Sequence, residues 1–205
     1  MYKIFLFSVI FLLFQSTTAR GLEEIYTLQD FYKSYKDIEG RFIQKSFIKE
    51  LNKSLSYEGT FYVKGKKMYL DYKGKRPQKV YVTESEIIIY QPKEKTAFRS
   101  SFDESKYGQT PLALIKGLTD IKNDFQTKKL SQNVLSLKPL KTMGNIEEIK
   151  VYLSTENPFP ISKILLNDKT GNHIEIIFTG VKVNEGIRDA VLMFNPPSDV
   201  TIINQ

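Results

Sequence analysis

The sequence of 205 residues contains no cysteine, no tryptophan and only one histidine. Without cysteine there is no disulfide, no thiol chemistry and no thiol on which a lipid could be attached. A zinc site is not expected either, because such sites draw most of their ligands from cysteine and histidine. Glycine-rich phosphate-binding loops are also missing. The sequence therefore offers little of the chemistry on which most enzymes depend.

The remaining candidates for catalysis are weak. His173 lies in the strand-like stretch GNHIEIIF, where a surface position explains it better than the role of a catalytic base. The acidic pairs 23–24 and 147–148 are adjacent in sequence. Neighbours on a strand face opposite sides and neighbours on a helix diverge by roughly 100°, so neither pair places two carboxylates over one substrate. We expect no catalytic residue, no metal and no cofactor. An enzyme whose acidic side chains are brought together only by the fold remains an alternative function, ranked third.

Long hydrophobic runs are also absent. The apolar run from Ile4 to Phe14 has 11 residues, whereas a membrane-spanning helix needs about 20. Lys3 precedes this run and the small residues 17–19 follow it, which is the pattern of a secretory signal peptide. We expect residues 1–19 to be cleaved, with a retained anchor as the alternative. Residues 20–205 should then form a single exported, soluble domain, which in a bacterium would reside in the periplasm.

Positive charge is in excess, with a formal net charge of +7. Such an excess can indicate nucleic-acid binding, but export argues against that partner. The excess is concentrated between residues 64 and 79, where Asp71 is the single acid. These side chains either are solvated turns that protect strand edges or form a patch for acidic lipid headgroups or an acidic partner. The second interpretation gives six candidate docking residues: Lys64, Lys66, Lys67, Lys73, Lys75 and Arg76.

Hydrophobic periodicity predicts a mainly β chain. Apolar residues spaced three or four apart predict an amphipathic helix over about 23–37. Period-two alternation then predicts about eleven strands, at 41–48, 56–63, 67–73, 79–83, 86–90, 123–129, 133–138, 146–153, 161–167, 172–179 and 187–194, with a tail at 200–203. Between the two halves, TPLALIKGL (110–118) predicts a short helix, because Thr110 can cap it, Pro111 fits its first position and Gly117 can end it.

The strands carry one apolar face. Met68, Leu70 and Tyr72 alternate with polar or aromatic neighbours, and the strands near 80–89 repeat the pattern. A large sheet with one apolar face must curl around something or be covered. Two interpretations remain open. The helices fill the interior of a half-barrel completely, or the interior stays partly unfilled.

Several stretches, taken in order, resemble the LolA family of periplasmic outer-membrane lipoprotein carriers from about residue 25 to 203. They are Phe42 with Gln44, Gly59 opening GTFYVK, the strand MYLDY, Pro77 before KVYV, IIIYQP, TPLALIKGL, and the closing block GNHIEIIFTGVKVNEGIRDAVLMFNPPSDVTII. The closing block is the most specific of these, because its Gly, Asn, Phe and Pro-Pro spacing matches the end of the family.

The resemblance implies an unclosed, strongly curved antiparallel β-barrel with a few helices covering its mouth and an apolar cavity inside. LolA-like carriers take acylated lipoproteins from an inner-membrane ABC-type releasing complex and pass them to an outer-membrane acceptor, with no covalent step. One departure concerns a Lys-Arg-Pro turn whose arginine holds the lid in many members. Here the turn reads VKGKK, and lysine lacks the planar fork of arginine, so no arginine role is transferred.

The resemblance and the alternation together give the expected acyl-binding residues. The sheet lining is expected from Phe42, Phe61, Val63, Met68, Leu70, Tyr72, Val80, Val82, Ile87 and Ile89, and the cover from Leu112, Leu114, Ile115 and Leu118. We expect a monomer that binds acylated lipoproteins and no nucleic acid. The alternative function is a periplasmic lipid-binding or sensing module of the same fold with a different ligand.

Overall fold

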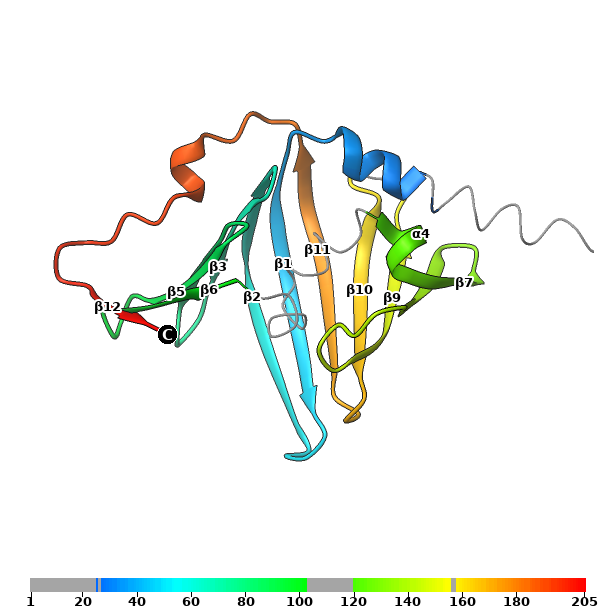
Figure 1. The fold of residues 1–205 in the computed structure, drawn as a ribbon, viewed down its shortest axis with the longest axis horizontal. Helices are drawn as coiled ribbons and strands as arrows, with labels where there is room; N and C mark the ends of the chain where they lie inside the picture. Colours follow the sequence, from blue (N-terminus) through cyan, green and yellow to red (C-terminus); the bar gives the residue numbers. More distant parts are fainter. Residues whose placement is uncertain (1–24, 26, 103–119, 156–157) are drawn as a thin grey trace, which may run out of the picture.

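Twelve strands form one sheet in the computed structural model, which describes residues 25, 27–102, 120–155 and 158–205 (Figure 1). The first half of the chain contributes β1 (Asp37–Ile48), β2 (Lys53–Lys64), β3 (Lys67–Tyr72), β4 (Gln78–Val82), β5 (Glu86–Gln91) and β6 (Thr96–Ser101). The second half contributes α4 (Ile121–Asp124), β7 (Phe125–Ser131), β8 (Val134–Pro139), β9 (Ile146–Leu153), β10 (Ile161–Asp168), β11 (His173–Val183), the 3₁₀ helix η2 (Asp189–Leu192) and β12 (Thr201–Asn204).

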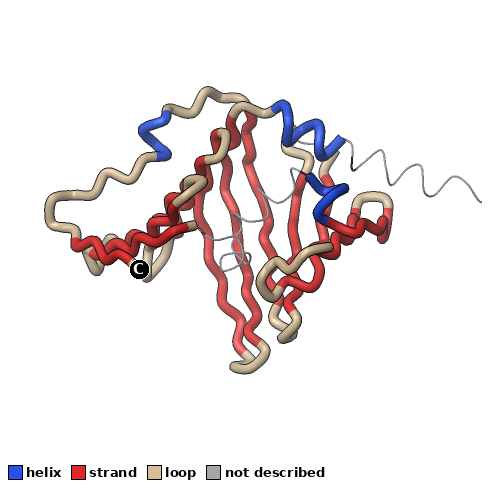
Figure 2. Tube along the Cα trace, viewed as in Figure 1, coloured by secondary structure: helices blue, strands red, loops and turns tan. Residues whose placement is uncertain are grey.

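The strand order across the sheet is β12-β6-β5-β4-β3-β2-β1-β11-β10-β9-β8-β7. All neighbouring pairs are antiparallel except β12 and β6, which are parallel. Because β7 and β12 lie at opposite ends of the order and do not pair, the sheet curves without closing (Figure 2). The expected unclosed, curved β fold is confirmed, with twelve strands in place of about eleven.

Two local predictions were wrong, and one strand was not predicted. Residues 187–194 form no strand, because Ile187 and Leu192 pack against Tyr69 on the face of the sheet opposite the main core. The segment 96–101 is strand β6, although its sequence shows little alternation. Residues 123 and 124 belong to helix α4, and the strand expected there begins at Phe125. The helix expected at 110–118 lies outside the described residues.

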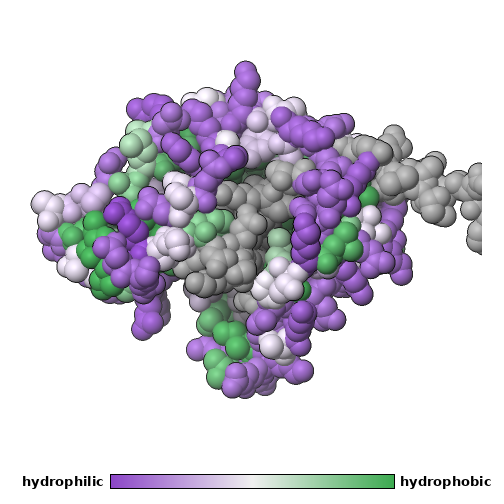
Figure 3. Space-filling model, viewed as in Figure 1, coloured by the Kyte–Doolittle hydropathy of each residue, from purple (hydrophilic) through white to green (hydrophobic). Residues whose placement is uncertain are grey.

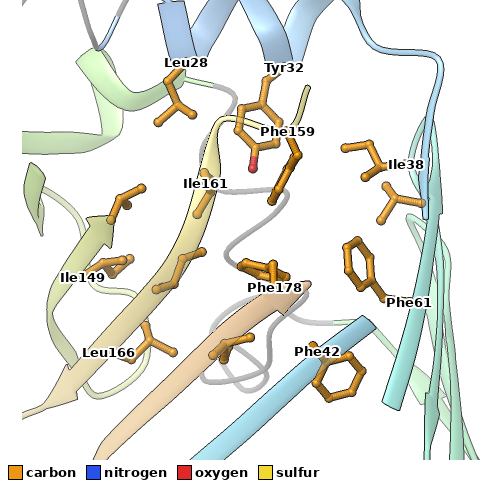
Figure 4. Packing of buried hydrophobic residues seen from close by; sticks show 14 of the residues in the cluster. Leu28, Tyr32, Ile38, Phe42, Phe61, Ile149, Phe159, Ile161, Leu166 and Phe178 are labelled. Carbon is orange, nitrogen blue, oxygen red and sulfur yellow. The ribbon is translucent and has the colours of Figure 1, made fainter. Parts of the chain in front are cut away.

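A helix that includes residues 27–34 lies across one end of the curved sheet (Figure 1). Leu28 and Tyr32 point from it into the main core, where the ring of its Phe31 contacts Phe159 at 5.7 Å between centroids (Figure 4). The helix ends three residues before the predicted position, because β1 already begins at Asp37. The apolar side of this helix therefore covers part of the concave side of the sheet.

Aromatic rings fill the centre of the main core. Phe178 on β11 packs edge-on against Phe61 and against Phe159, with both pairs of centroids 5.5 Å apart (Figure 4). Strands from both halves of the sheet contribute to this one cluster of buried side chains. The core thus joins the two halves on the concave side of the sheet.

Residues 184–200, here named the C-terminal strap, run along the other face of the sheet (Figure 1). The strap begins at the buried side chain of Asp37, whose carboxylate accepts hydrogen bonds from the backbone N–H groups of residues 185–187 at 2.9 to 3.3 Å. Lys64 donates to the carbonyl of Ile187 at 2.8 Å and pairs with Asp189 at 2.8 Å. These contacts place the strap over the stacked rings of Tyr69 and its neighbours.

Candidate functional site

A pocket of about 560 Å³ lies on the core side of the sheet, between β1, β2, β3, β4, β5 and β11. This volume falls within the range of roughly 300 to 1,000 Å³ that is usual for small-molecule sites. Its wall has an aliphatic inner part, a polar part that includes one charged side chain, and a second apolar part on the β1–β2 hairpin. The pocket therefore has the form expected of a site for an amphiphilic molecule.

The inner part of the wall is aliphatic. Leu70 on β3 faces Val80 on β4, and Val80 faces Ile89 on β5, so these three side chains form one row across adjacent strands. Ile87 extends the lining by two residues along β5. Because every second residue of a strand points to the same face, the alternation of these sequences directs all four side chains to the pocket.

The next part of the wall is polar. Tyr72 is opposite Gln78, and each lies two residues along its strand from Leu70 and Val80 of the aliphatic row. The hydroxyl of Tyr72 donates to Gln44 Oε1 at 3.2 Å, and Gln44 Nε2 donates to Ser46 Oγ at 3.1 Å. Burial, and secondarily the neighbouring Tyr57, raises the pKa of Tyr72. Its hydroxyl therefore remains a neutral hydrogen-bond donor at all physiological pH values.

Apolar surface continues towards the end of the β1–β2 hairpin. Phe47 and Ile48 on β1, together with Leu55 on β2, line this part of the pocket. Figure 3 shows hydrophobic surface at the lower end of the hairpin. On the adjacent strand β11, Ile174 lines the pocket, and Asn172 at its start accepts a hydrogen bond from the Lys49 N–H at 2.9 Å. The hairpin thus lengthens the apolar wall beyond the core.

Arg76 lies in the turn between β3 and β4 and is exposed. Among the described residues that line the pocket it is the only charged one. Lys93 Nζ donates a hydrogen bond to the carbonyl of Lys75, the neighbour of Arg76 in the same turn, at 2.7 Å. The side chain of Lys75 does not line the pocket. The pocket wall therefore carries one positive charge at its polar end.

The sequence-based lining residues separate into two sets in the structure. Five of the expected residues line the pocket itself: Leu70, Tyr72, Val80, Ile87 and Ile89. The other five expected sheet residues are buried in the adjoining main core: Phe42, Phe61, Val63, Met68 and Val82. The four expected cover residues, Leu112, Leu114, Ile115 and Leu118, lie outside the described residues.

Sequence reasoning missed the polar and hairpin parts of the wall. Gln44 and Ser46 share the face of Phe42 by simple period-two counting, and Ile48 continues the same row. This signal was present, but polar residues in an apolar row do not by themselves indicate a pocket. Arg76 was expected only in a docking patch, because a turn residue cannot be assigned to one face of a sheet from its sequence.

The six expected docking residues form two groups at opposite ends of β3. Lys64, Lys66 and Lys67 lie at the β2–β3 turn, and Lys73, Lys75 and Arg76 at the β3–β4 turn. The strand between them has 6 residues and, at about 3.3 Å per residue, separates the groups by roughly 17 Å. Several of these charges already have partners, since Lys66 pairs with Glu84 and Lys73 pairs with Asp71.

The described candidates His173 and Glu148 have structural partners, and the pair 23–24 lies outside the described residues. The exposed ring of His173 stacks on Phe47 at 4.9 Å. Glu148 accepts hydrogen bonds from Ser136 and Asn167 and pairs with Lys150. Within the described residues there is no group of three or more acidic or histidine side chains that could hold a metal ion. None of the helices formed by these residues is long and apolar enough to cross a membrane.

The sequence profile of the outer membrane lipoprotein carrier protein LolA matches residues 33–195. The chain belongs to the LolA family. A curated outer-membrane lipoprotein carrier protein from Wolinella succinogenes is 22% identical over 176 residues, which cover 85% of this chain and 90% of that protein. LolA-family proteins are binding proteins, and membership supports a role as a lipoprotein carrier.

Solved structures agree with the LolA fold at low sequence identity. A LolA superfamily protein from Nitrosomonas europaea superposes with a TM-score of 0.53 and 9% identity, over 85% of this chain and 97% of that one. A DUF1329 family protein from Desulfovibrio piger gives a TM-score of 0.52 and 13% identity, over 85% and 96% of the two chains. These likenesses concern the fold alone.

Proposed function

We propose that this protein is a periplasmic carrier that binds the acyl chains of lipoproteins and shuttles them from the inner to the outer membrane. The observation that carries the proposal is the pocket with an aliphatic inner wall on the core side of a LolA-family sheet. Residues 1–19 serve as the export signal in this proposal, and residues 20–205 form a single carrier domain. The protein makes and breaks no covalent bond.

The energetics of acyl chains explain why a carrier is needed. Burying a methylene group is worth about 0.8 kcal/mol, so a chain of roughly 16 carbons gains about 12 kcal/mol by leaving water. Three chains gain more than roughly 30 kcal/mol. Unassisted transfer of a lipoprotein between two membranes is therefore negligible. A carrier has to offer comparable apolar surface throughout the transit.

The size of the pocket limits what it holds in this conformation. A methylene group occupies roughly 30 Å³, similar to one water molecule in the liquid, so a 16-carbon chain needs roughly 480 Å³. The pocket of about 560 Å³ accommodates one such chain. A triacylated cargo would additionally use the apolar end of the β1–β2 hairpin.

Directional transfer follows from differences in affinity. Each acceptor has to bind the acyl chains more strongly than the previous holder, because a ligand shifts an equilibrium only by its differential affinity. In this proposal the cargo arrives from an inner-membrane ABC-type releasing complex and leaves to an outer-membrane acceptor. The five lysines in the two basic groups at the ends of β3 are the proposed docking residues.

Mass spectrometry of the natively purified protein tests this function. The mature protein would be isolated from a periplasmic extract without detergent, and the bound material would be extracted and identified. We expect peptides that carry an acylated N-terminal cysteine. Recovery of other lipids without any acylated peptide would contradict the carrier function and favour the alternative of a lipid-binding module.

A further inference from the structure

We propose that Arg76 binds an anionic group adjacent to the acyl chain, so that the pocket selects amphiphiles with a carboxylate or phosphate head. This inference rests on the proposed binding of acyl chains in the pocket. It adds a preference for negative charge beside the acyl chain; because the ester and amide groups of an acylated cysteine are neutral, a lipoprotein would supply that charge from its peptide. It also separates Arg76 from the docking residues with which its sequence position grouped it.

The position of Arg76 fits a head-group contact. Along β3 and β4 the wall passes from Leu70 opposite Val80 to Tyr72 opposite Gln78, and the chain then enters the turn that holds Arg76. A chain buried against the aliphatic row therefore has its polar end directed past the hydrogen-bonded tyrosine to the arginine. This order of apolar, neutral polar and charged groups matches the order of groups in an anionic amphiphile.

The charge of Arg76 is not neutralised within the described part of the protein. Asp71, the acid on the neighbouring strand β3, already pairs with Lys73 at 2.6 Å. None of the ion pairs formed by the described residues includes Arg76, and none of the described residues lining the pocket is an acid. An anion bound at this end of the pocket would meet an unpaired guanidinium.

The chemistry of arginine narrows the class of ligand. Its planar guanidinium donates two parallel hydrogen bonds to a carboxylate or a phosphate, which lysine cannot reproduce. The side-chain amide of Gln78 also lines the pocket and can donate to the same oxygens. A neutral head such as a methyl ester would leave the charge-assisted bonds unmade.

The test compares probes that differ only in the head group. A fluorescent 16-carbon fatty acid, its methyl ester and a lysophosphatidic acid with the same labelled chain would be titrated into the protein at pH 7.5 and low salt. We expect the two anionic probes to bind about fivefold more tightly than the ester, as for an exposed ion pair, and this preference to shrink at high salt. A gain for only one anionic probe identifies carboxylate or phosphate as the preferred head.

Three variants distinguish a specific contact with Arg76 from a general effect of positive charge near the pocket. Arg76→Glu should abolish the preference for the anionic probes over the ester, and Arg76→Lys should keep part of it. The matched control Lys75→Glu makes the same charge change one residue away and should retain the preference. Equal binding of acid and ester by the unaltered protein, or equal losses in Arg76→Glu and Lys75→Glu, would overturn the inference alone. Failure of all probes to bind would overturn the acyl-binding function as well.

Discussion

The ring of Phe42 on β1 lies over Gly59, its partner on β2, at a distance that leaves no room for a side chain. A Cβ atom placed on Gly59 would lie 2.8 Å from Phe42 Cζ and 2.4 Å from the carbonyl oxygen of Asp71. The same ring packs edge-on against Tyr72 at 5.1 Å. The absence of a side chain at Gly59 therefore allows an aromatic ring to fill the core beside the pocket.

Replacing Gly59 by alanine should destabilise the protein by roughly 1 to 3 kcal/mol, the usual cost of overpacking a core. The backbone carbonyl of Asp71 can only give way by distorting the β2–β3 pairing. Chemical unfolding followed by circular dichroism would measure the change. Ser56→Ala, at an exposed position on the same strand, serves as the control and should differ little from the unaltered protein. Equal stability of the two variants would contradict the contact.

Replacing Asp37 by asparagine should release the start of the C-terminal strap. The carboxylate accepts N–H bonds from residues 185–187, and hydrogen bonds to a charged group contribute about 1.5 to 3 kcal/mol. We expect a loss of that size in the free energy of unfolding and faster proteolysis between residues 184 and 200. Asp199→Asn, which alters an exposed pair with Lys95, should cost less than about 1 kcal/mol. Unchanged proteolysis in Asp37→Asn would argue against this anchor.

Lys64, the last residue of β2, holds the C-terminal strap beside its strand partner Asp37. It donates to the Ile187 carbonyl and pairs with Asp189, whose side chain is 67% exposed. Lys64→Met should therefore cost no more than about 1 kcal/mol, because exposed ion pairs contribute little. Thermal unfolding would measure this. If Lys64→Met lost as much stability as Asp37→Asn, the exposed contacts of Lys64 would contribute as much as the buried contacts of Asp37, which would contradict this prediction.

Asp168 should make stability depend on acidic pH. Burial alone would raise its pKa, but hydrogen bonds from Thr170 and Asn172 outweigh burial and hold the pKa below its ordinary value. The stabilisation is complete above the pKa of an unfolded aspartate, about 3.9, and is lost as pH falls through the lower folded value. The stability difference between the unaltered protein and Asp168→Asn should be constant above about pH 5 and shrink below about pH 4. A stability difference that is independent of pH would contradict the assignment.

The alternating stretches of the sequence were sufficient to predict a mainly β chain with one apolar face, whereas the unclosed, curved barrel was implied by the family resemblance. MYLDY and KVYV place their apolar residues on one face, and the structure pairs them as β3 and β4 with that face inwards. TAFRSS has only two apolar residues, yet it forms β6 because β5 and β12 supply hydrogen-bonding edges on both sides. Edge pairing of this kind depends on distant segments and leaves no local pattern.

The segment 187–194 shows the opposite error. Ile187 and Leu192 suggested a strand, but they pack on the tyrosines of the outer face, and the chain there bonds to Asp37 and Lys64. The irregularly spaced apolar residues of this segment therefore pack against the sheet but do not form one of its strands. The placement of Arg76 beside the pocket could not be predicted for a related reason, because the geometry of its turn is set by the tertiary structure.

The most direct test of the central claim is acyl-probe binding to a variant whose pocket has been filled. Ile89→Trp would occupy the aliphatic wall, whereas Ile43→Trp makes the same replacement at a position on β1 that is 38% exposed. The account predicts saturable binding of a fluorescent 16-carbon ester by the unaltered protein and by Ile43→Trp. It predicts at least about tenfold weaker binding by a folded Ile89→Trp, equivalent to roughly 1.4 kcal/mol. Equal affinity in all three proteins would show that acyl chains are not held in this pocket.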